Sequence, residues 1–273
     1  MTERFGVYEI EELSPGIYAI DDDRGESMYL VCGEKRALMI DTGSAPQPLT
    51  PLIRRYWTGP VDLVLTHTHF DHMYHSDEFR SVSLLEEEKK AWPKVLGPIV
   101  FLSSVGSGLK PKGYNVAGWR GLREGERIPL GGKSLRVIAA PGHTPGSLIL
   151  ADEADRLLFT GDAFGSGSYA WMWMPGCSCL SAYRESLKSL EKKLAPYRDY
   201  RMLGGHRRQA IPTPADPHAH RLDYETLGQM EKLCAGILSG EVLPEGTERN
   251  FGILNYRYRL GGAAVVLTRG KIK

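Results

Sequence analysis

The feature that most constrains this chain is a group of metal-binding side chains directly after an apolar strand. The apolar stretch Val61–Leu65 predicts the strand. It leads into a short segment with four candidate ligands: His67, His69, Asp71 and His72. Burying four ionisable groups together costs several kcal/mol unless a metal or hydrogen-bonding partners satisfy them. The cluster therefore predicts a metal site at the end of this strand.

Three further candidate ligands follow predicted strands later in the chain, each close to a glycine that permits a tight turn: His143, Asp162 and His206. Any one of them alone would more often be a surface residue or a hydrogen-bonded core residue. Together with the first cluster they form a set of imidazoles and carboxylates that suits two ions of a borderline metal such as zinc.

The segments between these positions alternate between strand and helix patterns. Short apolar runs predict strands at 16–20, 28–32, 37–40, 135–139, 148–150 and 157–160. Apolar spacing predicts helices after the proline-rich segment 46–51, at 180–194 and at 222–238, with a hairpin at 256–267. The glycine-rich segment 97–121 predicts a long loop or lid. We expect one layered α/β domain over 1–273, in which 207–273 form a C-terminal helix and hairpin extension.

Charge and targeting patterns narrow the partners and the compartment. The chain has 34 basic and 33 acidic residues, so bulk electrostatics favour neither nucleic acid nor an anionic membrane. The first residues lack a signal-peptide pattern, and no apolar stretch approaches the ~18 residues of a membrane span. Four cysteines are too few for a disulfide framework, and we expect Cys177 and Cys179 to be buried or half-buried thiols. We therefore expect a cytoplasmic protein.

In the order of these residues the chain resembles the metallo-β-lactamase fold superfamily, from about residue 15 to about residue 210. The resemblance implies an αβ/βα four-layer sandwich with the metal site at one edge between the sheets. It assigns the first metal to His67, His69 and His143, the second to Asp71, His72 and His206, and a bridging role to Asp162. It also implies that Asp41 is a buried acid that orients a histidine ligand.

This resemblance implies a hydrolase that needs no serine or cysteine nucleophile. Two ions, expected to be zinc although iron or manganese would also suit the ligands, hold a bridging hydroxide that attacks an acyl carbon or a phosphorus. Asp71 is expected to act as the catalytic acid–base residue, orienting the nucleophile and passing a proton to the leaving group.

Several branches of the superfamily fit poorly. The segment between Asp162 and His206 is too short for the domain that nucleases insert there, true zinc β-lactamases lack the bridging aspartate, and flavin-linked diiron relatives have glutamate at the position of His69. We expect cleavage of a small ester-like acyl bond (thioester, lactone or related amide), as in the glyoxalase II-like and lactonase-like branches. Phosphodiester hydrolysis and a mononuclear iron persulfide dioxygenase-like reaction remain alternatives. A non-catalytic scaffold would be expected only if a ligand were missing.

Four residues are candidates for contact with a small-molecule substrate: Tyr169, Trp171, Trp173 and His75. Lactonases often have a tyrosine after the bridging aspartate, which Tyr169 would supply. Trp171 and Trp173 indicate either an apolar substrate wall or a strand with one buried face, and we slightly favour the strand. His75 could be a base near the ligands, but we favour a surface position. A homodimer is expected from its general frequency among soluble proteins.

Overall fold

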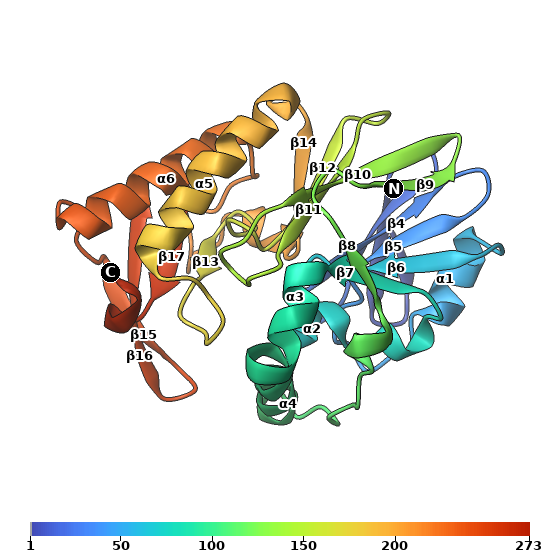
Figure 1. The fold of residues 1–273 in the computed structure, drawn as a ribbon, viewed down its shortest axis with the longest axis horizontal. Helices are drawn as coiled ribbons and strands as arrows, with labels where there is room; N and C mark the ends of the chain where they lie inside the picture. Colours follow the sequence, from blue (N-terminus) through green and yellow to red (C-terminus); the bar gives the residue numbers. More distant parts are fainter. Residues whose placement is uncertain (1) are drawn as a thin grey trace. The chain divides into compact units, whose positions relative to one another are not determined.

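A computed structural model describes residues 2–273, and three sheets organise it (Figure 1). The first sheet has eight strands in chain order: β1 Thr2–Phe5, β2 Tyr8–Ser14, β3 Ile17–Asp21, β4 Ser27–Cys32, β5 Ala37–Ile40, β6 Val61–Val64, β7 Val82–Leu85 and β8 Arg120–Leu122. Pairing is antiparallel from β1 to β5 and parallel from β5 to β8. The parallel strands end at a common edge, where loops carry functional side chains.

The second sheet has the order β14-β12-β11-β10-β9. Its strands are β9 Arg127–Gly131, β10 Lys133–Ala139, β11 Leu148–Asp152, β12 Leu157–Gly161 and β14 Arg201–Gly204. A third sheet has the order β13-β17-β16-β15, with β13 Tyr169–Trp171, β15 Gly246–Asn250, β16 Ile253–Leu260 and β17 Ala263–Leu267.

Helices connect and cover these strands. They are α1 Thr50–Tyr56, α2 Phe70–Met73, α3 Glu86–Ala91, α4 Gly97–Gly106, α5 Leu180–Leu194 and α6 Tyr224–Ser239. The apolar side chains of α5 at 3- and 4-residue spacing are buried, as amphipathic periodicity requires. Helices α5 and α6 lie side by side (Figure 1).

The fold is the expected mixed α/β fold, and most of the expected elements are confirmed. The structure contains strands at all seven expected positions, both long helices and the C-terminal hairpin. Cys177 is buried and Cys179 is half-buried, as expected, and both are free thiols.

The expectation of a long loop over 97–121 is wrong for its first part and confirmed for residues 107–119. The segment begins with α4 and enters β8 at Arg120. Two of its glycines, Gly97 and Gly106, lie at the ends of α4 rather than inside it, so they do not prevent the helix. Pro98 occupies the first turn, where a missing backbone N–H costs nothing.

The chain divides into two compact units. The first comprises Met1–Val137 and Leu150–Asp155, and the second comprises Ile138–Ile149 and Arg156–Lys273. The single-domain description of 1–273 stays a prediction. Among residues 2–273, none of the helices combines the length and the apolar character needed to cross a bilayer.

Candidate metal centre

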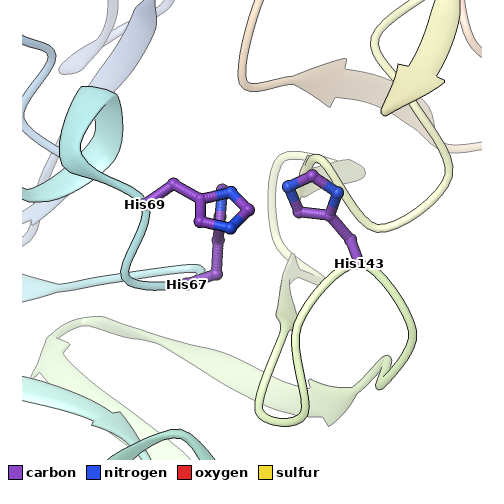
Figure 2. A group of neighbouring side chains, drawn as sticks. All are labelled: His67, His69 and His143. Atoms are coloured by element: carbon purple, nitrogen blue, oxygen red, sulfur yellow. The ribbon is translucent and has the colours of Figure 1, made fainter. Parts of the chain in front are cut away.

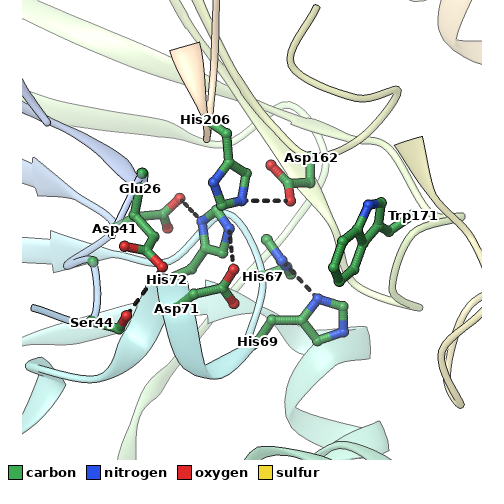
Figure 3. A network of polar contacts seen from close by, with 12 residues as sticks. Glu26, Asp41, Ser44, His67, His69, Asp71, His72, Asp162, Trp171 and His206 are labelled. Atoms are coloured by element: carbon green, nitrogen blue, oxygen red, sulfur yellow. Dashed lines mark hydrogen bonds and ion pairs between the residues drawn. The ribbon is translucent and has the colours of Figure 1, made fainter. Parts of the chain in front are cut away.

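Four of the expected ligands lie in the first unit, on the segment that follows β6. His67 and His69 occupy the extended loop before α2, and Asp71 and His72 lie in α2 itself (Figure 3). The three histidines are buried, although imidazoles are polar. The structure therefore brings these four side chains into one cluster, as expected.

Asp41 organises this cluster from the end of β5. One of its carboxylate oxygens accepts the backbone N–H of Thr66 at 2.7 Å. The other accepts the Thr66 hydroxyl at 2.7 Å and faces His72 Nδ1 at 2.9 Å. Asp41 also has a positive φ of 58°, which is uncommon for a residue other than glycine and concentrates at functional sites. The expectation that Asp41 orients a histidine is confirmed.

These contacts determine which histidine nitrogens can bind a metal. A carboxylate only accepts, so His72 donates from Nδ1 to Asp41 and turns Nε2 toward Asp71, 3.8 Å from Oδ2. Thr66 donates its hydroxyl proton to Asp41 and can accept from His67 Nδ1 at 3.1 Å, which leaves His67 Nε2 as an acceptor. His67 Nε2 lies 3.1 Å from His69 Nδ1. Two nitrogen ligands of one tetrahedral zinc ion are about 3.4 Å apart, so this spacing fits a shared ion.

Glu88 holds the turn between the first two histidines, a role that its sequence context does not indicate. Its carboxylate accepts both the backbone N–H and the hydroxyl of Thr68, each at 2.8 Å. The side chain is fully buried in α3. In the sequence it belongs to a run of three glutamates, which is typical of a solvated helix face.

His75 is buried, so the expected surface position is wrong. Its Nε2 lies 2.7 Å from the carbonyl oxygen of Ala45 and its Nδ1 lies 2.8 Å from Glu78 Oε1. Both partners offer acceptor oxygens, so each ring nitrogen of His75 is held by the protein. His75 therefore links the loop after β5 to Glu78, and its role in this structure is to support that loop.

Glu78 links His75 to the start of α1. Its carboxylate accepts the backbone N–H groups of Leu49 and Thr50 at 3.1 and 2.8 Å. Burial alone would raise the pKa of Glu78, but the hydrogen bonds from His75, Thr50 and Leu49 outweigh it and lower the pKa to about 2. The ionised carboxylate is therefore favoured by folding.

Replacing Glu78 with glutamine should remove an acid-dependent part of the stability. A carboxyl whose pKa falls from 4.5 to about 2 on folding stabilises the protein fully above pH 4.5 and progressively less as the pH falls toward 2. The shift corresponds to roughly 3 kcal/mol at neutral pH. Urea unfolding should show a large difference between wild type and Glu78→Gln at pH 7 that shrinks below pH 4. The matched variant Glu87→Gln, at an exposed position of α3, should show little difference at either pH.

The remaining expected ligands lie in the second unit, on three separate loops. Figure 2 draws one of them, His143, which comes from the loop between β10 and β11. Asp162 directly follows β12 and His206 follows β14 after one glycine (Figure 3). Asp162 Oδ2 lies 3.8 Å from His143 Nε2 and 3.3 Å from His206 Nε2. One carboxylate oxygen thus faces two imidazoles.

Hydrogen bonds from neighbouring residues fix the positions of these three ligand residues. His143 Nδ1 donates to the carbonyl oxygen of Trp171 at 2.9 Å, which directs Nε2 toward Asp162. Ser166 donates to Asp162 Oδ1 at 3.4 Å and accepts the backbone N–H of His206 at 3.1 Å. A Cβ at Gly204 would lie 2.6 Å from Ser166 Oγ, so only glycine allows this approach.

Tyr183 supports two of these loops from α5, although its spacing in the helix indicates only a core residue. Its ring packs against Gly142, where a Cβ would lie 2.4 Å from Tyr183 Cδ2. Its hydroxyl donates to the carbonyl oxygen of Ala163 at 2.9 Å. Complete burial raises the pKa of Tyr183 well above its usual value, so the hydroxyl keeps its proton and remains a donor.

The donor set suits a divalent metal. Each unit has histidines with one nitrogen anchored to a protein partner and the other nitrogen directed toward a carboxylate, which is the pattern of metal-ligating histidines. The groups of His and Asp side chains that can hold a metal ion include all seven expected positions. Three imidazoles or two imidazoles with carboxylates suit zinc, iron or manganese.

The expected substrate residues of the second unit occupy different environments. Tyr169 is the first residue of β13, and its hydroxyl donates a hydrogen bond to the Glu245 carboxylate. The guanidinium carbon of Arg259 lies 4.6 Å from the centroid of the Tyr169 ring. Trp173 is buried, whereas Trp171 is 42% exposed. Their roles toward a substrate stay predictions.

Comparison with known proteins identifies the family. The family model described as Metallo-beta-lactamase superfamily matches residues 21–206, which is more than half of the chain. The chain belongs to this superfamily. As a superfamily member with relatives that hydrolyse acyl substrates, it is a metal-dependent hydrolase.

Two relatives and one solved structure show the range of this likeness. This metallo-hydrolase is 30% identical to the acyl-coenzyme A thioesterase MBLAC2 of Gallus gallus, over 71% of this chain and 78% of that protein. It is 25% identical to the hydroxyacylglutathione hydrolase GloC of Haemophilus influenzae, over 63% of this chain and 81% of that protein. The crystal structure of TTHA1623 in a di-iron-bound form aligns with a TM-score of 0.53 and 29% identity, over 66% of this chain and 87% of that chain.

Proposed function

We propose that the chain is a dinuclear metal-dependent hydrolase that cleaves an acyl thioester. Its two ions, which we take to be zinc, would be held by His67, His69, Asp71, His72, His143, Asp162 and His206. The family match supports joining the ligands of the two units into one site, because it spans all seven positions.

The position of Asp162 carries the two-metal proposal. Its Oδ2 faces His143 Nε2, assigned to the first ion, and His206 Nε2, assigned to the second. A carboxylate between ligands of two different ions is suited to bridge them.

The chain's own residues would prepare and finish the reaction. When bound, the ions supply a water of lowered pKa and polarise the acyl oxygen. Asp41 fixes the ring of His72, and Trp171 fixes that of His143, so neither ligand must reorganise during turnover. Asp71, which is partly exposed beside His72, is placed to take a proton on its carboxylate and deliver it to the departing thiolate.

The substrate class follows from the relatives. MBLAC2 and GloC are named for acyl-coenzyme A and for hydroxyacylglutathione, and both of these compounds carry an acyl group on sulfur. We therefore place a thioester ahead of a lactone or amide, with phosphodiester hydrolysis and persulfide oxidation as alternatives. A cytoplasmic location, a small-molecule substrate and a homodimer remain part of the proposal.

Hydrolysis of a substrate panel tests this function, with thiol release measured for the thioesters and release of acid, phosphomonoester or alcohol measured for the other compounds. The panel comprises acetyl- and octanoyl-coenzyme A, a hydroxyacylglutathione, a lactone and a phosphodiester, assayed with the purified chain. We expect thioesters to be the best substrates, with activity lost after chelation and restored by zinc. Preferred cleavage of the phosphodiester, or oxygen uptake with a persulfide and iron, would contradict the proposal and select the corresponding alternative.

A further inference from the structure

An exposed phenylalanine stands at the tip of the β15–β16 hairpin in a backbone conformation that disfavours it. Asn250 pairs with Ile253, which leaves Phe251 and Gly252 as a two-residue turn. Both have positive φ, 50° for Phe251 and 79° for Gly252. Such turns favour asparagine followed by glycine. The Phe251 side chain is also 65% exposed, so its burial contributes little to the stability of the fold. An exposed aromatic side chain on a strained backbone indicates a functional role for the ring.

The Phe251 ring continues a row of aromatic side chains that starts beside a candidate metal ligand. The ring of Trp173 lies 6.1 Å from that of Phe251 and 5.9 Å from that of Trp171, measured between centroids. The carbonyl oxygen of Trp171 accepts the hydrogen bond from His143 Nδ1. All four residues belong to the second unit. The row thus runs from the residue that anchors His143 to the tip of the hairpin.

We infer that the exposed rings of Trp171 and Phe251, packed on the buried Trp173 between them, form an acyl-binding strip and that Phe251 makes the enzyme selective for long apolar acyl groups. The inference rests on the proposed thioesterase function and adds to it the acyl group that the site prefers. Phe251 lies beyond residues 21–206, so it belongs to the part of the chain that the family model does not describe.

The dimensions and chemistry of the strip fit an acyl chain. The two ring-to-ring steps of 5.9 and 6.1 Å are together comparable to an extended acyl chain of about ten carbons, because a C–C bond of about 1.5 Å advances a zigzag chain by only about 1.25 Å. The neighbouring residues at the tip, Ile253 and Leu254, are also apolar and 44% and 40% exposed. An apolar chain on this surface would remove from water both the chain and the exposed rings of Trp171 and Phe251.

Selectivity between acetyl- and octanoyl-coenzyme A tests the inference in Phe251→Asn. Asparagine tolerates positive φ, so this variant should fold with an unchanged or higher Tm and the same metal content as wild type. We expect its kcat/KM to fall about tenfold more for the octanoyl than for the acetyl substrate. Phe251→Trp should retain the preference of wild type. The control Leu243→Ala removes an exposed leucine from the loop before β15 and should retain it too.

A binding measurement distinguishes an error in this inference from an error in the proposed function. A non-hydrolysable octyl thioether of coenzyme A should bind wild type more tightly than Phe251→Asn by about tenfold in calorimetry, whatever reaction the enzyme catalyses. If wild type cleaves no thioester but this difference in affinity holds, the proposed function fails and the strip stands. Equal affinities, or equal losses on both substrates in Phe251→Asn, would overturn the strip.

Discussion

Replacing Asp162 with alanine is expected to reduce the bound metal from about two ions per chain to one or fewer and to lower kcat/KM by about a thousandfold. The reason is geometric. A single oxygen of this side chain faces both His143 and His206, so its removal deprives both ions of a ligand. Metal analysis of the purified variant and hydrolysis of its best thioester substrate would measure the two effects.

A matched aspartate separates this effect from a general loss of charge. Asp199 lies in the same unit and pairs with Arg156 at an exposed position. Asp199→Ala should keep the wild-type metal content and activity, because exposed ion pairs contribute little. Should Asp162→Ala retain two ions and full activity, the bridging role would be wrong. A small effect of Asp162→Ala combined with one bound iron would favour the mononuclear alternative.

Replacing Asp41 with asparagine should weaken metal binding by about 10- to 100-fold, even though residue 41 is not a ligand. Three donors face the Asp41 carboxylate: the Thr66 N–H, the Thr66 hydroxyl and His72 Nδ1. An amide has one oxygen and a donating NH2 group, so at least one of these donors loses its acceptor. Stability should fall by about 1–3 kcal/mol for the buried group left unpaired.

Asparagine is an informative substitution at this position because it accepts a positive φ, which removes backbone strain as an explanation. Competition with a chelator of known affinity would give the metal affinity, and urea unfolding would give the stability. Asp21, another buried aspartate of the first unit, accepts a hydrogen bond from Ser27 at 2.6 Å. Asp21→Asn should lower stability without changing metal affinity. Unaltered affinity in Asp41→Asn would refute the orienting role.

The ligand positions could be predicted from the sequence because strand ends fix them. Val61–Leu65 is apolar enough to identify a buried strand, and the residues after it must emerge at the edge of the sheet. The same holds for Asp162 after β12. Periodicity likewise identified α5, since its buried leucines recur at helical spacing.

The supporting residues could not be predicted because their roles depend on contacts between distant segments. Glu88 resembles its exposed neighbours in sequence, and only the fold brings it to Thr68. Tyr183 has the spacing of a core residue, and its hydroxyl bond to Ala163 leaves no local signal. His75 could be placed only once Ala45 and Glu78 were known to flank it. Phe251 carried no signal because the turn conformation, rather than the residue type, makes it unusual.

Metal content of the purified chain, measured by inductively coupled plasma mass spectrometry without added metal, tests the two-metal site most directly. About two zinc ions per chain are expected, because the proposed function assigns seven ligands to two neighbouring metal sites. Two ions of another divalent metal would keep the dinuclear mechanism and change only the metal. A single ion per chain in fully active enzyme would contradict it.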